Sequence, residues 1–207
     1  MPFMEGKEKI REYLQKVNEK ENVIEYTLFQ PGIFLDYLAF PHKTSKYIDP
    51  LQTFFDIQNK RAIVVAGHED AIMTLTTAAD LAAIVARAVD YEGKWPIYGG
   101  IRGNRCTFSQ IIEIGGRVRG QPFIVEKAQL SDLEAGELKT SWTLEAVHAA
   151  VSPAEAAAML KIVSIGILLS STKGAWDVSD EMSALFPDHR FTRVEEFLEK
   201  VWGAKAE

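Results

Sequence analysis

Short β-branched runs alternate with capped helical segments along most of this 207-residue chain, and this alternation limits its possible folds more than any other feature. The strand-like runs are residues 24–29, 62–66, 72–76, 95–98 and 122–125. A polar, aperiodic stretch from Pro41 to Pro50 indicates a surface loop. Because strands that alternate with helices are typical of sheets covered by helices, the sequence predicts an α/β fold.

Helix starts are marked by hydroxyl residues followed three positions later by an acidic or amide residue. These pairs are Thr77 with Asp80, Thr107 with Gln110, Ser152 with Glu155, and Thr192 with Glu195. Gly120 is expected to end the second of these helices as a C-cap. A further helix is predicted near the N-terminus, where Ile10, Leu14 and Val17 share one face.

Charge and cysteine content exclude several classes of function. The net charge of −6 argues against a nucleic-acid or anionic-membrane surface. Cys106 is the only cysteine, so a reducing compartment is the simpler expectation. The first residues form no signal-like apolar segment, and the run from Ile162 to Leu169 is far shorter than the roughly 20 residues of a membrane span. We therefore expect a cytoplasmic protein without a membrane partner.

Four segments, in this order, resemble NmrA-like and isoflavone-reductase-like proteins, which are atypical members of the short-chain dehydrogenase superfamily. They are residues 6–11 (GKEKIR), 26–34 (YTLFQPGIF), 76–82 (TTAADLA) and 185–192 (LFPDHRFT). Residues 95–103 most resemble fungal members of the family. The resemblance implies the C-terminal portion of a Rossmann-type NAD(P)-binding fold with a small α/β substrate-binding domain. In that arrangement, residues 1–40 are a remnant of the Rossmann core and 41–207 are mostly the substrate side of a single domain.

The family's glycine-rich cofactor turn has no counterpart here. In the family, a Gly-x-x-Gly-x-x-Gly turn after the first strand binds the pyrophosphate of the cofactor. The segments 99–103 and 115–120 are rich in glycine but have the wrong spacing or lie in a helix, so we expect tight turns and a helix C-cap. The resemblance implies NADP as the cofactor, whereas the missing turn predicts an N-terminally truncated family member.

Lys7 is the candidate catalytic residue. In the resembling reductases, the lysine four residues before an arginine on a helix, as Lys7 precedes Arg11 here, lies beside the nicotinamide and transfers a proton. A lysine does so only when burial or a nearby positive charge lowers its pKa. The alternative is a solvated lysine in a charge-rich helix.

The bend after the 24–29 run is the second candidate. The resemblance places the nicotinamide near Gln30, Pro31 and Gly32, with the ring of Phe34 over the substrate pocket. Such a bend lies at the carboxyl end of a strand, where open α/β sheets bind ligands. Tyr37 and Trp142 are further candidates for lining the same pocket. The alternative is an ordinary turn with Phe34 in the core.

Other reactive side chains suggest no site. The four histidines are scattered without metal-ligand spacing, so no metal is expected, and His68-Glu69-Asp70 suggests a polar turn. Cys106 has no nearby catalytic partner in the sequence and is expected to be a buried, inert thiol.

Three functions follow from the resemblance. The first is an NAD(P)H-dependent reductase of a small organic substrate, incomplete as given. The second is a non-enzymatic, dinucleotide-sensing regulator, because a fold does not determine a function. The third is an inactive truncated paralogue. In that case the Tyr26–Phe29 strand would lack a neighbour, and the exposed sheet edge would favour homo-oligomers.

Overall fold

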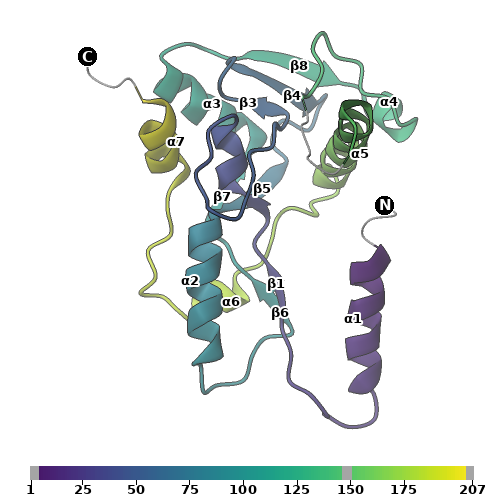
Figure 1. The fold of residues 1–207 in the computed structure, drawn as a ribbon, viewed down its shortest axis with the longest axis vertical. Coiled ribbons are helices and arrows are strands. Elements are labelled where there is room, and N and C mark those ends of the chain that lie inside the picture. Colours follow the sequence, from purple (N-terminus) through teal and green to yellow (C-terminus); the bar gives the residue numbers. More distant parts are fainter. Residues whose placement is uncertain (1–4, 146–150, 204–207) are drawn as a thin grey trace.

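The computed structural model describes residues 5–145 and 151–203, and Figure 1 shows how their helices and strands are arranged. The helices are α1 (Glu5–Val17), α2 (Ala78–Val89), α3 (Phe108–Arg119), α4 (Leu130–Glu134), α5 (Pro153–Ser171), α6 (Glu181–Ala184), α7 (Val194–Trp202) and the 3₁₀ helix η2 (Leu35–Ala39). The strands are β1 (Leu28–Gln30), β2 (Ile33–Phe34), β3 (Phe55–Asp56), β4 (Arg61–Val65), β5 (Ile72–Thr76), β6 (Tyr98–Gly100), β7 (Asn104–Thr107) and β8 (Ile124–Ala128). The predicted α/β class is confirmed.

The strands form three small sheets. β1 pairs in parallel with β6, with Leu28 opposite Tyr98. The second sheet has the order β2-β5-β7, in which β2 is parallel and β7 antiparallel to β5. The third has the order β3-β4-β8, in which β3 is antiparallel and β8 parallel to β4. Parallel neighbours joined through helices, such as β4 and β8, are the pairing expected of an α/β protein.

Gly32 allows the chain to pass from the first sheet to the second. It has a φ of 72°, in the left-handed region that glycine enters without a steric penalty. A Cβ at this position would lie 2.2 Å from the carbonyl oxygen of Thr74 on β5. Glycine therefore both turns the backbone between β1 and β2 and lets it approach β5 closely.

Three of the four predicted helix caps are confirmed. Thr77 accepts from the backbone N–H of Asp80, and both Thr107 and Ser152 form complete capping boxes. Gly120, with a φ of 67°, ends α3 as expected. These caps are local, so the sequence alone specifies them.

The predicted Thr192 cap is wrong. α7 begins after Arg193, which makes no side-chain cap, and the Thr192 N–H donates to Asp80 instead. The N–H of Val194, the first residue of α7, donates to the side-chain oxygen of Asn104 on β7. The N-terminus of α7 is thus capped by a residue 90 positions away in the sequence, and not by the neighbouring Thr192.

Three strands begin later than predicted: β8 begins at Ile124, and in β1 and β6 side chains hold the preceding residues in loops. The Asn18 side chain accepts from the N–H groups of Val23 and Ile24 and donates to the Ile24 carbonyl, so Ile24 is not part of β1. The Trp95 backbone N–H donates to Glu25 and its indole to the Ala88 carbonyl, so β6 begins only at Tyr98. By contrast, β4 and β5 lie within a residue of their expected positions.

The main core lies between the second and third sheets and the helices around them. Its centre includes the rings of Phe54 and Phe108, stacked with centroids 5.5 Å apart. A smaller core joins α2 to α6 through Ile84, Ile101 and Met182. In Figure 1, α1 stands apart from both, beside the strands β1 and β6.

The N-terminal elements expose apolar side chains. On α1, Ile10 is 60% and Tyr13 66% exposed, although both lie on the apolar face of this amphipathic helix. Among the described residues, β1 has only β6 as a strand neighbour, so its other edge is unpaired. An unpaired strand edge beside exposed apolar residues is a typical docking or aggregation surface.

By length and composition alone, α5 could cross a membrane, which the sequence did not lead us to expect. A core helix of a soluble protein passes the same test, and the second half of α5 packs into the main core.

Candidate functional site

The bend at residues 30–32 lies at the carboxyl end of β1, as predicted. All three residues are half-buried, and the Gln30 carbonyl accepts from the N–H of Ile101 just beyond β6. The Gln30 side-chain amide has no hydrogen-bond partner among the described residues. The bend therefore presents an unpaired amide where two parallel strands end.

A cavity of about 160 Å³, called here the Tyr37 cavity, begins one residue beyond the bend. It lies between β2, η2, the 51–55 segment, β5 and α5. Its lining residues are Ile33, Tyr37, Leu38, Leu51, Gln52, Thr53, Phe54, Phe55, Met73, Leu75, Leu160, Val163, Ser164 and Ile167. Burial and the nearby Asp36 carboxylate raise the pKa of Tyr37 above its usual value, so the phenol stays protonated at neutral pH. Tyr37, one of the predicted substrate-binding residues, thus lies in the wall of a cavity beside the bend.

Phe34 and Trp142 occupy other places. The Phe34 ring packs edge-on against Tyr37, with centroids 5.9 Å apart, and is not part of the cavity wall. Trp142 lines a separate cavity of about 280 Å³ on the other side of α5, together with Leu138, Leu144 and Lys161. The guanidinium of Arg61 lies 4.0 Å from the Trp142 ring centroid. Tyr37 and Trp142 therefore do not line one pocket, because α5 contributes to the walls of both cavities and separates them.

Lys7 lies on the exposed surface of α1 and lines none of the cavities described here. The structure does not bring Lys7 together with the bend or with Tyr37. The sequence-predicted site residues therefore form three groups: Lys7, the bend with Phe34 and Tyr37, and Trp142. Proton transfer by Lys7 would require α1 to be packed against the bend.

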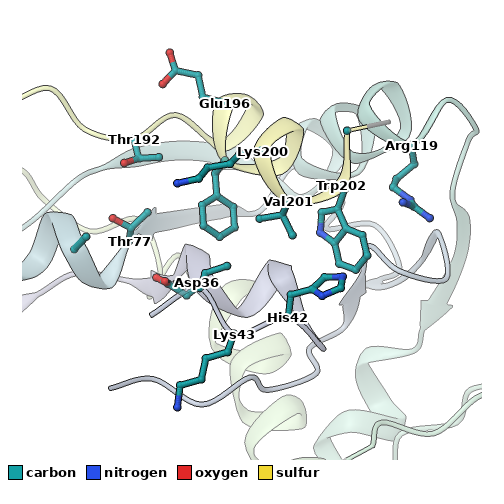
Figure 2. Close-up of a pocket in the computed structure, with 14 residues that line it drawn as sticks. Asp36, His42, Lys43, Thr77, Arg119, Thr192, Glu196, Lys200, Val201 and Trp202 are labelled. Atoms are coloured by element: carbon teal, nitrogen blue, oxygen red, sulfur yellow. Dashed lines mark hydrogen bonds between the residues drawn. The ribbon is translucent and has the colours of Figure 1, made fainter. Parts of the chain in front are cut away.

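A groove of about 970 Å³ lies between the loop after η2 and the C-terminal helix α7 (Figure 2). Trp202 forms part of its wall, with the His42 ring 4.8 Å from it and the Arg119 guanidinium 5.1 Å from its centroid. Several of its charged groups are already bound within the chain: Lys43 pairs with Asp49, and Glu196 pairs with Arg190. None of the sequence-predicted site residues lines this groove.

Asp36, at one end of the groove, has a structural role. Its buried carboxylate accepts from Thr44 Oγ1 at 2.9 Å and from the N–H of Ala78 at 2.8 Å. It therefore occupies the N-terminus of α2, the position where an anionic ligand would bind.

Asp80, one turn into α2, joins distant segments. Its carboxylate accepts from Thr77 Oγ1 at 2.6 Å and from Thr192 N–H at 3.1 Å, and lies 3.0 Å from His189 Nε2. Two of the segments that resemble the family, 76–82 and 185–192, are thus held together by one buried carboxylate. The sequence showed Asp80 only as a partner in a helix cap.

Neither glycine-rich segment forms a cradle for a diphosphate. A Cβ on Gly100 would lie 2.3 Å from the Ser179 carbonyl oxygen, and one on Gly103 would lie 2.8 Å from that of Leu75. These glycines admit the protein's own backbone, and the 115–120 segment forms α3 and its C-cap. This agrees with the sequence reading that both glycine-rich segments have structural roles.

Cys106 is half-buried on β7, less buried than expected. Burial raises the pKa of its thiol, and Arg193 partly opposes this effect. A raised pKa keeps the thiol protonated and weakly nucleophilic, as the inert role required.

Comparison with solved structures defines the class of fold. Isoflavone reductase superposes with a TM-score of 0.58 at 20% identity, covering 96% of this chain and 58% of that one. An NADPH-dependent quinone oxidoreductase from Escherichia coli gives 0.55 at 19% identity, covering 89% and 58%. This chain therefore shares the Rossmann-like fold of these two oxidoreductases, as the resemblance predicted.

Sequence comparison adds fungal relatives. The oxidoreductase swnN of Metarhizium robertsii is 28% identical over 183 residues, which cover 87% of this chain and 52% of the relative. The swnN protein of Arthroderma benhamiae is 23% identical over 202 residues, covering 87% and 62%. No family model matches the chain. The chain is thus a homologue of fungal oxidoreductases and spans little more than half the length of these relatives.

Proposed function

We propose that this chain provides the substrate side of an NADP(H)-dependent oxidoreductase that reduces a small organic compound. The observation that carries the proposal is the direct succession of the bend at 30–32 and the Tyr37 cavity at the carboxyl end of β1. Ligands of open α/β sheets bind at this end of the strands. The oxidoreductase names of the fungal relatives and the reductase fold support the same function.

The nicotinamide end of the cofactor is assigned to the bend. The unpaired amide of Gln30 is complementary to the carboxamide of a nicotinamide ring, and the adjoining Pro31 and Gly32 leave backbone groups beside it. When bound, such a cofactor supplies a hydride. The diphosphate does not fit either glycine-rich segment, so other residues, or a second chain, would have to bind it.

This division of the cofactor site is tested with two nucleotides. Reduced nicotinamide mononucleotide lacks the diphosphate-linked adenosine that NADPH carries. We expect both to bind the chain weakly and within about threefold of each other, since only the nicotinamide end has a site. Gln30→Ala should weaken both by about three- to tenfold, the effect of one hydrogen bond. Gln58→Ala, at an exposed position, is the matched control.

The possible outcomes separate the alternatives. Absence of binding for both nucleotides would overturn the assignment of the bend. NADPH binding a hundredfold tighter than the mononucleotide would show that a diphosphate site exists after all. Binding without NADPH oxidation in the presence of small aldehydes, ketones and quinones would favour a nucleotide-sensing regulator over a reductase.

A further inference from the structure

We infer that the Tyr37 cavity selects a small, neutral, largely apolar compound with one carbonyl group, and that the hydroxyls of Tyr37 and Ser164 are the two polar contacts for that group. The inference rests on the proposed function, because it takes this cavity as the substrate site of the reductase. It names the class of compound and adds Ser164, which the sequence did not single out.

The cavity wall excludes charged compounds. Its fourteen lining residues include no lysine, arginine, histidine, aspartate or glutamate. A carboxylate or phosphate would lose its hydration there without gaining a partner of opposite charge, which is strongly unfavourable. The volume of about 160 Å³ also lies well below the roughly 300 Å³ at which sites for drug-sized ligands begin. Both properties favour a compound of about one ring.

Two of the four polar side chains in the wall are already satisfied. Gln52 donates to Asp56 at 3.2 Å and accepts from the Glu145 N–H. The Thr53 hydroxyl donates to the Phe55 carbonyl and accepts from the Phe55 N–H. Tyr37 and Ser164 are left without a side-chain hydrogen bond among the described residues.

Ser164 is the more informative of the two, because it is only 2% exposed and lies in a helix. Hydroxyl residues inside helices usually bond to a carbonyl one turn earlier. Further along α5, Ser170, Ser171 and Thr172 all do so, at 2.7–2.8 Å. Ser164 does not, so its hydroxyl stays available for a hydrogen bond. A ligand in the cavity would provide the missing partner.

Tyr37 faces the same cavity from η2. Its raised pKa keeps the phenol neutral, so it can donate a hydrogen bond to a ligand oxygen. A carbonyl oxygen has two lone pairs and can accept from both hydroxyls. The cavity wall thus includes two residues, from separate elements, whose hydroxyls make no hydrogen bond within the described part of the chain.

The test compares benzaldehyde, toluene and benzoate, which share a ring but carry a carbonyl, no polar group and a charge, respectively. Binding is followed by NMR of the protein labelled with ¹³C at the methionine methyl groups. Met73 is fully buried and lines the cavity, so its methyl reports on occupancy there. Met159, which is 55% exposed, and Met182, in the smaller core, serve as internal references.

We expect benzaldehyde to shift the Met73 methyl signal and benzoate to leave it unchanged. Tyr37→Phe and Ser164→Ala should each weaken benzaldehyde binding by about three- to tenfold. Toluene affinity should stay within about twofold, since it makes no hydrogen bond. Tyr47→Phe and Ser131→Ala remove exposed hydroxyls and are the matched controls.

The inference is overturned if none of the three compounds shifts Met73, if benzoate binds as tightly as benzaldehyde, or if both variants bind benzaldehyde like the unmodified chain. Melting curves of the variants identify any that fail to fold, and the other variant then decides. No nucleotide is present in this assay, so its result is independent of the cofactor. Carbonyl binding in the cavity without any nicotinamide binding at the bend would reject the proposed function alone.

Discussion

Replacing Gly32 by alanine tests the geometry that joins the bend to the second sheet. The substitution forces a residue with a side chain into a φ of 72°, which costs roughly 1–2 kcal/mol. It also places a methyl group where the Thr74 carbonyl oxygen is 2.2 Å away, and overpacking of this kind costs roughly 1–3 kcal/mol. Because Thr74 lies in the middle of β5, its backbone cannot move without disturbing two neighbouring strands.

The free energy of unfolding of Gly32→Ala should therefore fall by between about 2 and 5 kcal/mol. For a chain of this size, about 3 kcal/mol corresponds to a fall in Tm of roughly 6–12 °C. Denaturant unfolding followed by tryptophan fluorescence measures the change, and calorimetry gives the Tm.

Gly67→Ala is the matched control. Gly67 has a φ of 79°, and a Cβ there would meet nothing within 4 Å. It therefore carries the backbone penalty without the clash, and we expect a loss of about 1–2 kcal/mol. If Gly32→Ala destabilises the protein no more than Gly67→Ala, the close approach of the bend to β5 does not exist and the placement of the cavity beside it is wrong.

Three further predictions concern the other parts of the molecule. Asp80→Ala leaves the buried Thr77 hydroxyl and the Thr192 N–H without their acceptor, so the free energy of unfolding measured with denaturant should fall by about 3 kcal/mol. Asp90→Ala, at an exposed position, should have little effect, and equal losses for the two variants would show that Asp80 does not hold the C-terminal segment. Since the pKa of Tyr37 is raised in the folded state, its contribution to stability is complete below the pKa of a free tyrosine and decreases as the pH rises through the folded pKa. The Tyr37→Phe variant should therefore lose less free energy of unfolding than the unmodified chain between neutral pH and about pH 11, and parallel curves of stability against pH would contradict the raised pKa. Self-association should be favoured by the unpaired edge of β1 and by the exposed Ile10 and Tyr13, so the Tm should rise with protein concentration and light scattering should detect oligomers. A monomer with a concentration-independent Tm would reject the prediction of self-association.

The candidate site shows where inference from sequence ends. The bend at 30–32 was predicted from a strand-like run followed by Pro31-Gly32. Tyr37 lies a few residues further along the chain, in η2. Ser164 was missed, although a serine within the apolar run from Ile162 to Leu169 was a signal that could have indicated it. Trp142 was assigned to the same pocket as Tyr37 because a sequence does not reveal that a helix lies between two side chains.

The sequence by itself determined the features that depend on near neighbours in the chain. The caps at Thr77, Thr107 and Ser152, the C-cap at Gly120 and the strands β4 and β5 follow from hydrogen bonds and side-chain periodicity within a few residues. The resemblance to a reductase family also followed from short ordered segments, and the fold confirms it.

Only the tertiary structure decided how distant segments satisfy one another. The start of α7 depends on Asn104, the C-terminal segment on Asp80, and the starts of β1 and β6 on Asn18 and Glu25. In each case a backbone N–H bonds to a side chain that is remote or outside the expected element, and such a partner has no local signature. The same holds for the Tyr37 cavity, whose wall combines residues of η2, β5 and α5 that are far apart in the sequence.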